Sequence, residues 1–322
     1  MSARNILMAA AGAQPSLNVA DVFSAYPYSG TGAAQSLSPG VDLSTYGGLF
    51  WSKTRATTGG HRLFDSERGN NYLDTSSIAA QAGNTGVSPT TSGVNLAIAG
   101  SVNASGYTYI GWMFRKAAKF FDVVPYTGDG TSTKTVAHSL GTMPGIIVVK
   151  RTDSTGNWVV WHRSLSTDTV LMFHTTHAAF GVSAGTFSSV GASSFSVGHP
   201  TNQPCNESGS SYVAYLFAHD DSASGIVQCG SVTTAADGTA SITLGWQPQY
   251  LLWKSATNAV AWQVADTARG WVGGGNNNNL LTPNSTATET TGNGAPGTPT
   301  ETGINFVAEA SQTLIYMAIR AA

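Results

Sequence analysis

His174 and His177 are the one closely spaced pair of histidines in this sequence, and they are the first place to look for metal chemistry. Two threonines separate them, whereas a zinc site needs three or four ligands that converge on one point. On an extended strand these two positions face opposite sides, so one ion could bind both only if the chain turned between them. We therefore prefer a structural role for the pair and expect no metal and no cofactor.

Carboxylates are the second group that could be catalytic. Hydrolysis of a polysaccharide needs two carboxyl groups about 5 to 9 Å apart, and Glu67, Glu207 and Glu301 are too scattered to nominate a pair, although folding could assemble one. The sequence has no Gly-x-Ser-x-Gly elbow, Walker loop or zinc-protease helix motif. Residues 126–130 are explained better by a hairpin turn than by a phosphate cradle. We expect a protein that is not an enzyme, with a depolymerase as the alternative.

Two short segments combine an acid and a base at the same spacing. Asp65 precedes Arg68 by three residues, Asp266 precedes Arg269 by three, and glycine follows each arginine. Such a pair could bind a ligand, but this spacing more often fixes a tight loop through a charge-assisted hydrogen bond, with glycine supplying a positive φ. Its recurrence within one chain favours the structural role.

Recurring markers show how the chain is organised. Apolar segments end in Lys53, Lys150 and Lys254, which are 97 and 104 residues apart. An Asn-x-Ser-Gly box beginning at Asn103 returns at Asn206, each time before an alternating aromatic segment. Markers that recur in one order at nearly constant spacing predict an internal repeat of about 100 residues, present three times.

The pattern between these markers predicts the fold class. Apolar and polar residues alternate in short runs that Gly, Asn and Ser interrupt, and no helical period extends over three turns, which is typical of β-sandwiches. We predict an all-β protein of three tandem β-sandwich (jelly-roll-like) repeats with a short N-terminal arm. The arm would dock on a neighbour or on the first unit, or form a short helix. The predicted boundaries are 1–20 for the arm and 21–119, 120–223 and 224–322 for the units.

Tryptophans on the predicted strands have two possible roles. Trp158 and Trp161 lie on one segment, and Trp262 lies on the corresponding segment of the third unit. Aromatic residues at alternate strand positions normally fill the core between sheets. A platform for stacking sugars would instead require Trp158, Trp161, Trp262 or Trp271 to face water.

The third unit contains the longest polar insertion. A run of three glycines and four asparagines at 273–279 precedes a Thr, Pro and Gly-rich span at 282–302. Loops of this length are uncommon in compact domains unless they have a function or belong to a linker. We predict that they form the contact surface of this unit, with the candidate contact residues Trp271, Asn276, Asn277, Asn278 and Asn279.

Composition limits the partners. Charged residues make up 10% of the chain, against about 25% in an ordinary soluble domain. A net charge of −2 without a basic cluster argues against nucleic acid as a partner, and no apolar run approaches the ~20 residues of a membrane span. Because interface cores are depleted of charged residues, the composition favours a subunit of an assembly. The alternative is an extracellular β protein with a Ser/Thr surface.

Cys205 and Cys229 are the only cysteines and flank the junction between the second and third units. One disulfide between them is geometrically possible. Two cysteines do not make a disulfide framework, so we prefer two separate buried thiols.

The repeat resembles one found in bacteriophage virion proteins that are commonly labelled tail fibre or tail proteins. Residues 120–130, residues 138–150 and the Asn103 box before residues 109–115 carry the resemblance, which covers residues 21–220 well and the third unit more loosely. It implies a virion component that assembles with other copies of itself and other virion proteins, and host surface glycan is a further partner. The alternatives are a capsid decoration or head fibre protein and a carbohydrate-binding receptor-recognition module.

Overall fold

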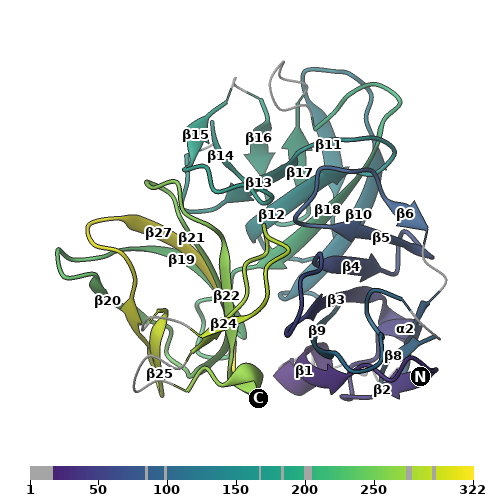
Figure 1. The fold of residues 1–322 in the computed structure, drawn as a ribbon. Helices are drawn as coiled ribbons and strands as arrows, with labels where there is room; N and C mark the ends of the chain where they lie inside the picture. Colours follow the sequence, from purple (N-terminus) through teal and green to yellow (C-terminus); the bar gives the residue numbers. More distant parts are fainter. Residues whose placement is uncertain are drawn as a thin grey trace, which may run out of the picture.

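The regular secondary structure of the protein is almost all β, as the sequence predicted (Figure 1). Its helices within the described residues are single turns: α1 (Val19–Val22), α2 (Leu43–Tyr46) and the 3-10 turn η1 (Thr267–Arg269). The computed structural model describes residues 17–83, 86–97, 100–166, 168–182, 185–198, 205–272, 278–291 and 295–322.

The first unit pairs one large and one small antiparallel sheet. The large sheet has the order β1-β9-β3-β4-β5-β6 and the small one β2-β8-β7. The strands are β1 (Phe23–Ser29), β2 (Gln35–Leu37), β3 (Gly48–Thr54), β4 (Arg62–Asp65), β5 (Asn71–Asp74), β6 (Ala82–Gly83), β7 (Val87–Thr90), β8 (Gly93–Leu96) and β9 (Thr108–Arg115).

The second unit repeats this plan. Its large sheet has the order β10-β18-β12-β13-β14-β15 and its small sheet β11-β17-β16. The strands are β10 (Phe121–Thr127), β11 (Lys134–Ala137), β12 (Pro144–Arg151), β13 (Trp158–His162), β14 (Thr169–Met172), β15 (Phe180–Gly181), β16 (Phe187–Val190), β17 (Ser194–Val197) and β18 (Ser211–Ala218).

The third unit has the same core with a shorter large sheet. The order β19-β27-β21-β22 matches the first four strands of the other large sheets, the small sheet is β20-β26-β25, and β23 pairs with β24. The strand orders within the three predicted boundaries therefore correspond to one another. The strands are β19 (Val227–Thr233), β20 (Thr239–Thr243), β21 (Pro248–Ser255), β22 (Gln263–Asp266), β23 (Asn279–Leu280), β24 (Thr290–Thr291), β25 (Gly297–Thr300), β26 (Gly303–Val307) and β27 (Thr313–Arg320).

Each large sheet is buried on both faces. In β3, Phe50 packs in a core between the two sheets of the first unit, whereas its neighbour Trp51 points into a second, central core. Because successive strand residues face opposite sides, both faces must be apolar, which explains the nearly continuous apolar segments seen in the sequence. Val148 in β12 and Leu252 in β21 also lie in the central core, so the three units meet there (Figure 1).

The predicted N-terminal arm is only partly described. Residues 1–16 lie outside the described part of the chain. Residues 19–22 form α1, which Asn18 caps by accepting a hydrogen bond from the Ala20 amide. Val19 and Val22 are buried in the central core, so this end of the arm belongs to the body of the protein.

Candidate functional site: the closing seam between the third and first units

A segment of the third unit crosses onto the first unit. We call residues 278–291 the strap, and its contact with the first unit the closing seam. The strap begins after β22 and η1 and contains the β23–β24 hairpin. Hydrogen bonds to its backbone join it to the first unit, among them those between the Gly59 amide and the Thr286 carbonyl (2.8 Å), the Glu289 amide and the Arg55 carbonyl (2.8 Å), and the Thr75 hydroxyl and the Pro283 carbonyl (2.5 Å).

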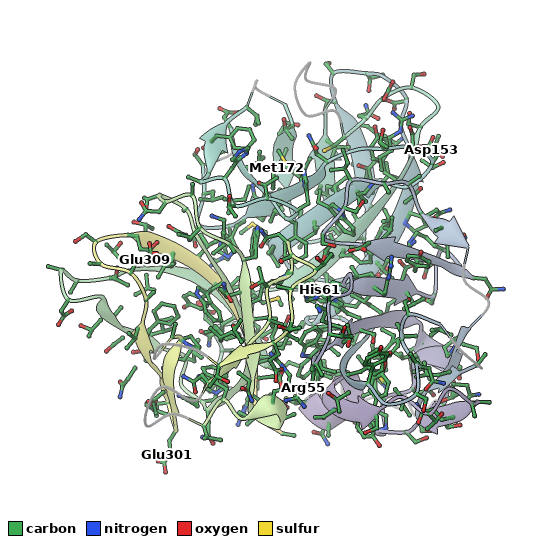
Figure 2. All side chains as sticks on the ribbon, viewed as in Figure 1. Arg55, His61, Asp153, Met172, Glu301 and Glu309 are labelled. Atoms are coloured by element: carbon green, nitrogen blue, oxygen red, sulfur yellow. The ribbon has the colours of Figure 1, made fainter. Side chains whose placement is uncertain are left out.

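Charged side chains reinforce this seam. Glu289 accepts from Arg55, with Nη2 2.6 Å from Oε1, and from Arg269, with Nη1 3.0 Å from Oε2. Arg269 also donates from Nε to Asp266 at 2.6 Å, and Asp266 accepts from the indole of Trp112 in the first unit at 2.9 Å. The hydrogen bond from Arg55 to Glu289 raises the pKa of the arginine. Figure 2 shows Arg55 and His61 where the two units meet.

The same acid-and-arginine motif lies at the contact between the first and second units. Arg68 donates from Nε to Asp65 at 2.6 Å, and the Asp65 carboxylate also accepts from the Arg68 amide at 2.9 Å. Tyr215 of the second unit donates its hydroxyl to Asp65 at 2.7 Å and accepts from Arg68 at 3.1 Å. The predicted structural role of the motif is confirmed. In addition to fixing its own turn, the pair contacts the next unit.

Glycine completes the motif for a backbone reason. After η1, the chain reverses at Gly270, whose φ of +99° is in the left-handed region. A side chain at this position would be strained. The turn keeps Arg269 directed back at Asp266, and both side chains are inaccessible to solvent.

Three of the five predicted contact residues lie in the described part of the chain, and two of them are buried. Trp271 is 0% exposed and packs in the third unit's own core, with its indole donating to the Gly297 carbonyl at 3.0 Å. Asn278 is 2% exposed and donates to the same carbonyl at 3.2 Å, and the side chain of Asn279 donates to the Arg269 carbonyl. The prediction is wrong for Trp271 and Asn278, whose polar groups satisfy a buried backbone carbonyl, whereas Asn279 is half-buried. Asn276 and Asn277 lie outside the described residues.

The position of the strap also differs from the prediction for residues 282–302. This span was expected to form an external contact surface of the third unit, but residues 282–289 pack against the first unit of the same chain. Sequence reasoning missed both Arg55 and Glu289, which are 234 residues apart. A single sequence contains no signal that links two isolated charges over such a distance.

The strand tryptophans are buried, which confirms their predicted core role. Trp158, Trp161 and Trp262 are 0%, 6% and 1% exposed. With Trp271 also buried, none of these four residues faces water as a sugar-stacking platform would require. Two of the indoles instead join neighbouring units: Trp158 donates to the Ser77 carbonyl and Trp262 to the Met172 carbonyl, both at 2.9 Å.

The cysteines and His174 of the predicted sites are held within the fold. Cys205 and Cys229 are separate, buried thiols, as preferred from the sequence, and burial raises the pKa of Cys205 to about 12. His174 accepts from the Trp158 amide at 3.4 Å, and burial lowers its pKa to about 4, so it is neutral at pH 7. Within the described ranges, no group of three His, Cys, Asp or Glu side chains is placed to hold a metal ion.

One further structural observation concerns membranes. Among the residues with described positions, no helix has the length and apolar character needed to cross a bilayer.

No curated protein matches this chain. A family model described as a domain of unknown function (DUF7483) matches residues 18–320, which include all three units, the strap and the closing seam. Because the match extends over nearly the whole sequence, the chain belongs to this family.

Proposed function

We propose that the protein is a non-enzymatic structural protein of a bacteriophage virion. In this proposal it is a tail fibre or tail-associated subunit that works as a symmetric oligomer and contributes to assembly and attachment to the host surface. The observation that carries the proposal is the structural role of the motif residues through which the sequence resembles phage tail proteins.

Those motif residues hold the framework of each unit. In the second unit, the Asn206 amide group donates to the Thr131 carbonyl at 2.9 Å and accepts from the Asp129 amide at 2.9 Å, which fixes the turn after β10. Asn103 makes the corresponding contacts in the first unit, accepting from the Thr31 amide at 3.0 Å. Residues that stabilise turns suit a rigid building block of a particle.

Asp122 illustrates the same point in the strand that opens the motif. Its carboxylate accepts from the Ser139 amide at 2.7 Å, which ties β10 to the turn before β12. Tyr126 stacks on Tyr212 with ring centroids 5.2 Å apart and donates its hydroxyl to the Cys205 carbonyl at 2.7 Å. These contacts use the polar atoms of the motif for internal support.

The low charge of the chain supports assembly with other proteins. Several of its few charged groups are buried in pairs, among them the two Asp–Arg motifs, which leaves fewer charges for the exterior. A lightly charged surface costs little to desolvate when a partner covers it. Exposed apolar side chains occur at Tyr46, Ile78, Tyr107, Met143 and Val272.

Localisation on the particle tests this proposal. Antibodies raised against the purified protein are applied to virions of a phage that encodes it, and the bound label is imaged by electron microscopy. We expect the label on the tail. Label on the head would support the capsid decoration alternative, and absence of the protein from purified virions by mass spectrometry would overturn the proposal.

A further inference from the structure

The three units contact one another through one recurring set of backbone hydrogen bonds. In each case an amide of one unit donates to the carbonyl two residues beyond the strand-ending lysine of the next unit. The bonds are Gln81 to Thr152 (2.9 Å), Ala179 to Ala256 (2.9 Å) and Glu289 to Arg55 (2.8 Å). They run from the first unit to the second, from the second to the third, and from the third back to the first.

Side-chain contacts follow the same cyclic order. Asp65, His162 and Asp266 occupy equivalent positions, because they pair in register with Leu49, Ile146 and Tyr250 near the start of β3, β12 and β21. Each of the three reaches the long central strand of the next unit. Asp65 bonds to Tyr215 in β18 (2.7 Å), His162 to the Tyr316 carbonyl in β27 (3.1 Å) and Asp266 to Trp112 in β9 (2.9 Å).

The residues that these three side chains contact are also equivalent or adjacent in the fold. Trp112 pairs with Trp51 and Tyr215 pairs with Val148, so both occupy the same place in their sheets. Tyr316 is next to Met317, which occupies that place in the third unit by pairing with Leu252. We name the two surfaces after the backbone bond alone: the donor surface of a unit carries its donating amide, and the acceptor surface carries the carbonyl beyond the lysine. A donor surface on one unit therefore meets an acceptor surface on the next three times in succession.

We propose that the three units of the chain form a closed ring in which the donor surface of each unit binds the acceptor surface of the next. These contacts hold the units together even when a linker between two of them is cut. A head-to-tail contact of this kind produces an open filament unless the rotation brings the last member back to the first. Here the ring closes after three units, since the third unit's donor surface is covered by the first. The closing seam is the contact at which no linker joins consecutive units, and it also carries the Arg55–Glu289–Arg269 ion pairs.

Each of these surfaces has its partner within the same chain. The donor surface of every unit binds the acceptor surface of another unit of this fold, so the ring leaves neither surface free for a further copy. An oligomer of the whole protein must therefore form through other parts of its exterior.

Cutting one linker in the full-length chain tests the proposal. The turn at residues 221–224, between β18 and β19, is exposed, and a recognition sequence for a specific protease is inserted there. After complete cleavage, size-exclusion chromatography at about 1 µM is expected to show both fragments eluting together at the position of the uncut protein. Such behaviour requires a Kd below about 0.1 µM. Separation of the fragments, or their precipitation on cutting, would overturn the proposal.

A pair of substitutions tests whether the closing seam provides part of this binding. Arg55→Ala in the cleavable chain is expected to weaken the association of the fragments by tenfold or more, while the uncut variant remains folded by circular dichroism. Lys134→Ala is the matched control, because it also removes a cation from an ion pair, here with Asp129, but within the second unit. Equal loss of association in both variants would contradict the assigned surface.

Discussion

Three buried lysines occupy the same place in the three units. Lys53, Lys150 and Lys254 are 1%, 0% and 0% exposed, and each donates from Nζ to the carbonyl of the following residue. Desolvation lowers the pKa of all three to about 8. Around Lys254, burial is the cause of this change, which makes it the clearest case for measurement.

Replacement of Lys254 by methionine should show how the burial of its amine affects the free energy of unfolding. A lysine titrates near 10.4 in the unfolded chain, so between pH 8 and 10 the unfolded state holds more protons than the folded state. The free energy of unfolding of the wild type therefore rises over this window relative to that of Lys254→Met. We expect the variant to be more stable by roughly 1–2 kcal/mol at pH 7 and to lose this advantage by pH 10.

Urea unfolding at several pH values measures this difference. Lys134→Met is the control, because it removes a lysine whose side chain is 25% exposed. A stability difference between wild type and Lys254→Met that stays constant from pH 7 to 10 would show that burial does not lower the pKa of the Lys254 amine.

Tyr215 tests the contact between the first and second units at a single atom. Its hydroxyl bonds to Asp65 and Arg68, both of which are shielded from water. Tyr215→Phe removes one partner from a buried carboxylate, which costs about 1–3 kcal/mol. Tyr107→Phe is the matched control at a residue that is 42% exposed, and we expect it to change the free energy of unfolding by less than about 0.5 kcal/mol. Equal effects of the two substitutions would argue against the contact.

At the scale of elements, the strap is the feature that distinguishes the third unit. The first two units continue their large sheets through β4-β5-β6 and β13-β14-β15, whereas in the third unit the large sheet ends at β22. Leu281 of the strap bridges to Val264 in β22, so the strap takes the place of the missing strands. It covers the sheet edge and reaches the first unit at the same time.

Glu289 provides the sharpest test of the strap. Glu289→Gln keeps the size of the side chain but removes the charge that Arg55 and the buried Arg269 share. We expect a loss of about 2 kcal/mol in the free energy of unfolding, because a buried arginine loses one of its two anionic partners. Glu301→Gln is the control at an exposed turn at the outer edge of the third unit (Figure 2). Indistinguishable urea midpoints for the two variants would contradict the role of the strap.

Local features of this fold could be predicted from the sequence, and long-range ones could not. The apolar segments ending in lysine and the Asn-x-Ser-Gly boxes are local patterns, and they mark strands β3, β12 and β21 and the turns that Asn103 and Asn206 hold. Trp271 was misjudged because the Gly/Asn-rich run beside it suggested an exposed loop, although an indole gains most from burial. The closing seam depends on where the third unit lies relative to the first, which no local pattern specifies.

At the scale of the whole molecule, the shared core determines how the protein unfolds. Trp51, Val148 and Leu252 come from three different units and lie in one continuous cluster of buried side chains. Removing any one unit would expose the central faces of the other two large sheets. The repeated sequence therefore does not imply three independently stable domains. The bonds around the ring make each unit depend on both of its neighbours.

Differential scanning calorimetry should consequently record one unfolding transition. We expect a single peak whose calorimetric and van't Hoff enthalpies agree, with a total of roughly 200 kcal/mol near 60 °C for a chain of this length. Glu289→Gln should shift this peak to lower temperature without splitting it, because loosening the closing seam destabilises all three units through the common core. Three resolved peaks of roughly 70 kcal/mol each would instead mean that the units unfold separately and that the cyclic contacts contribute little to stability.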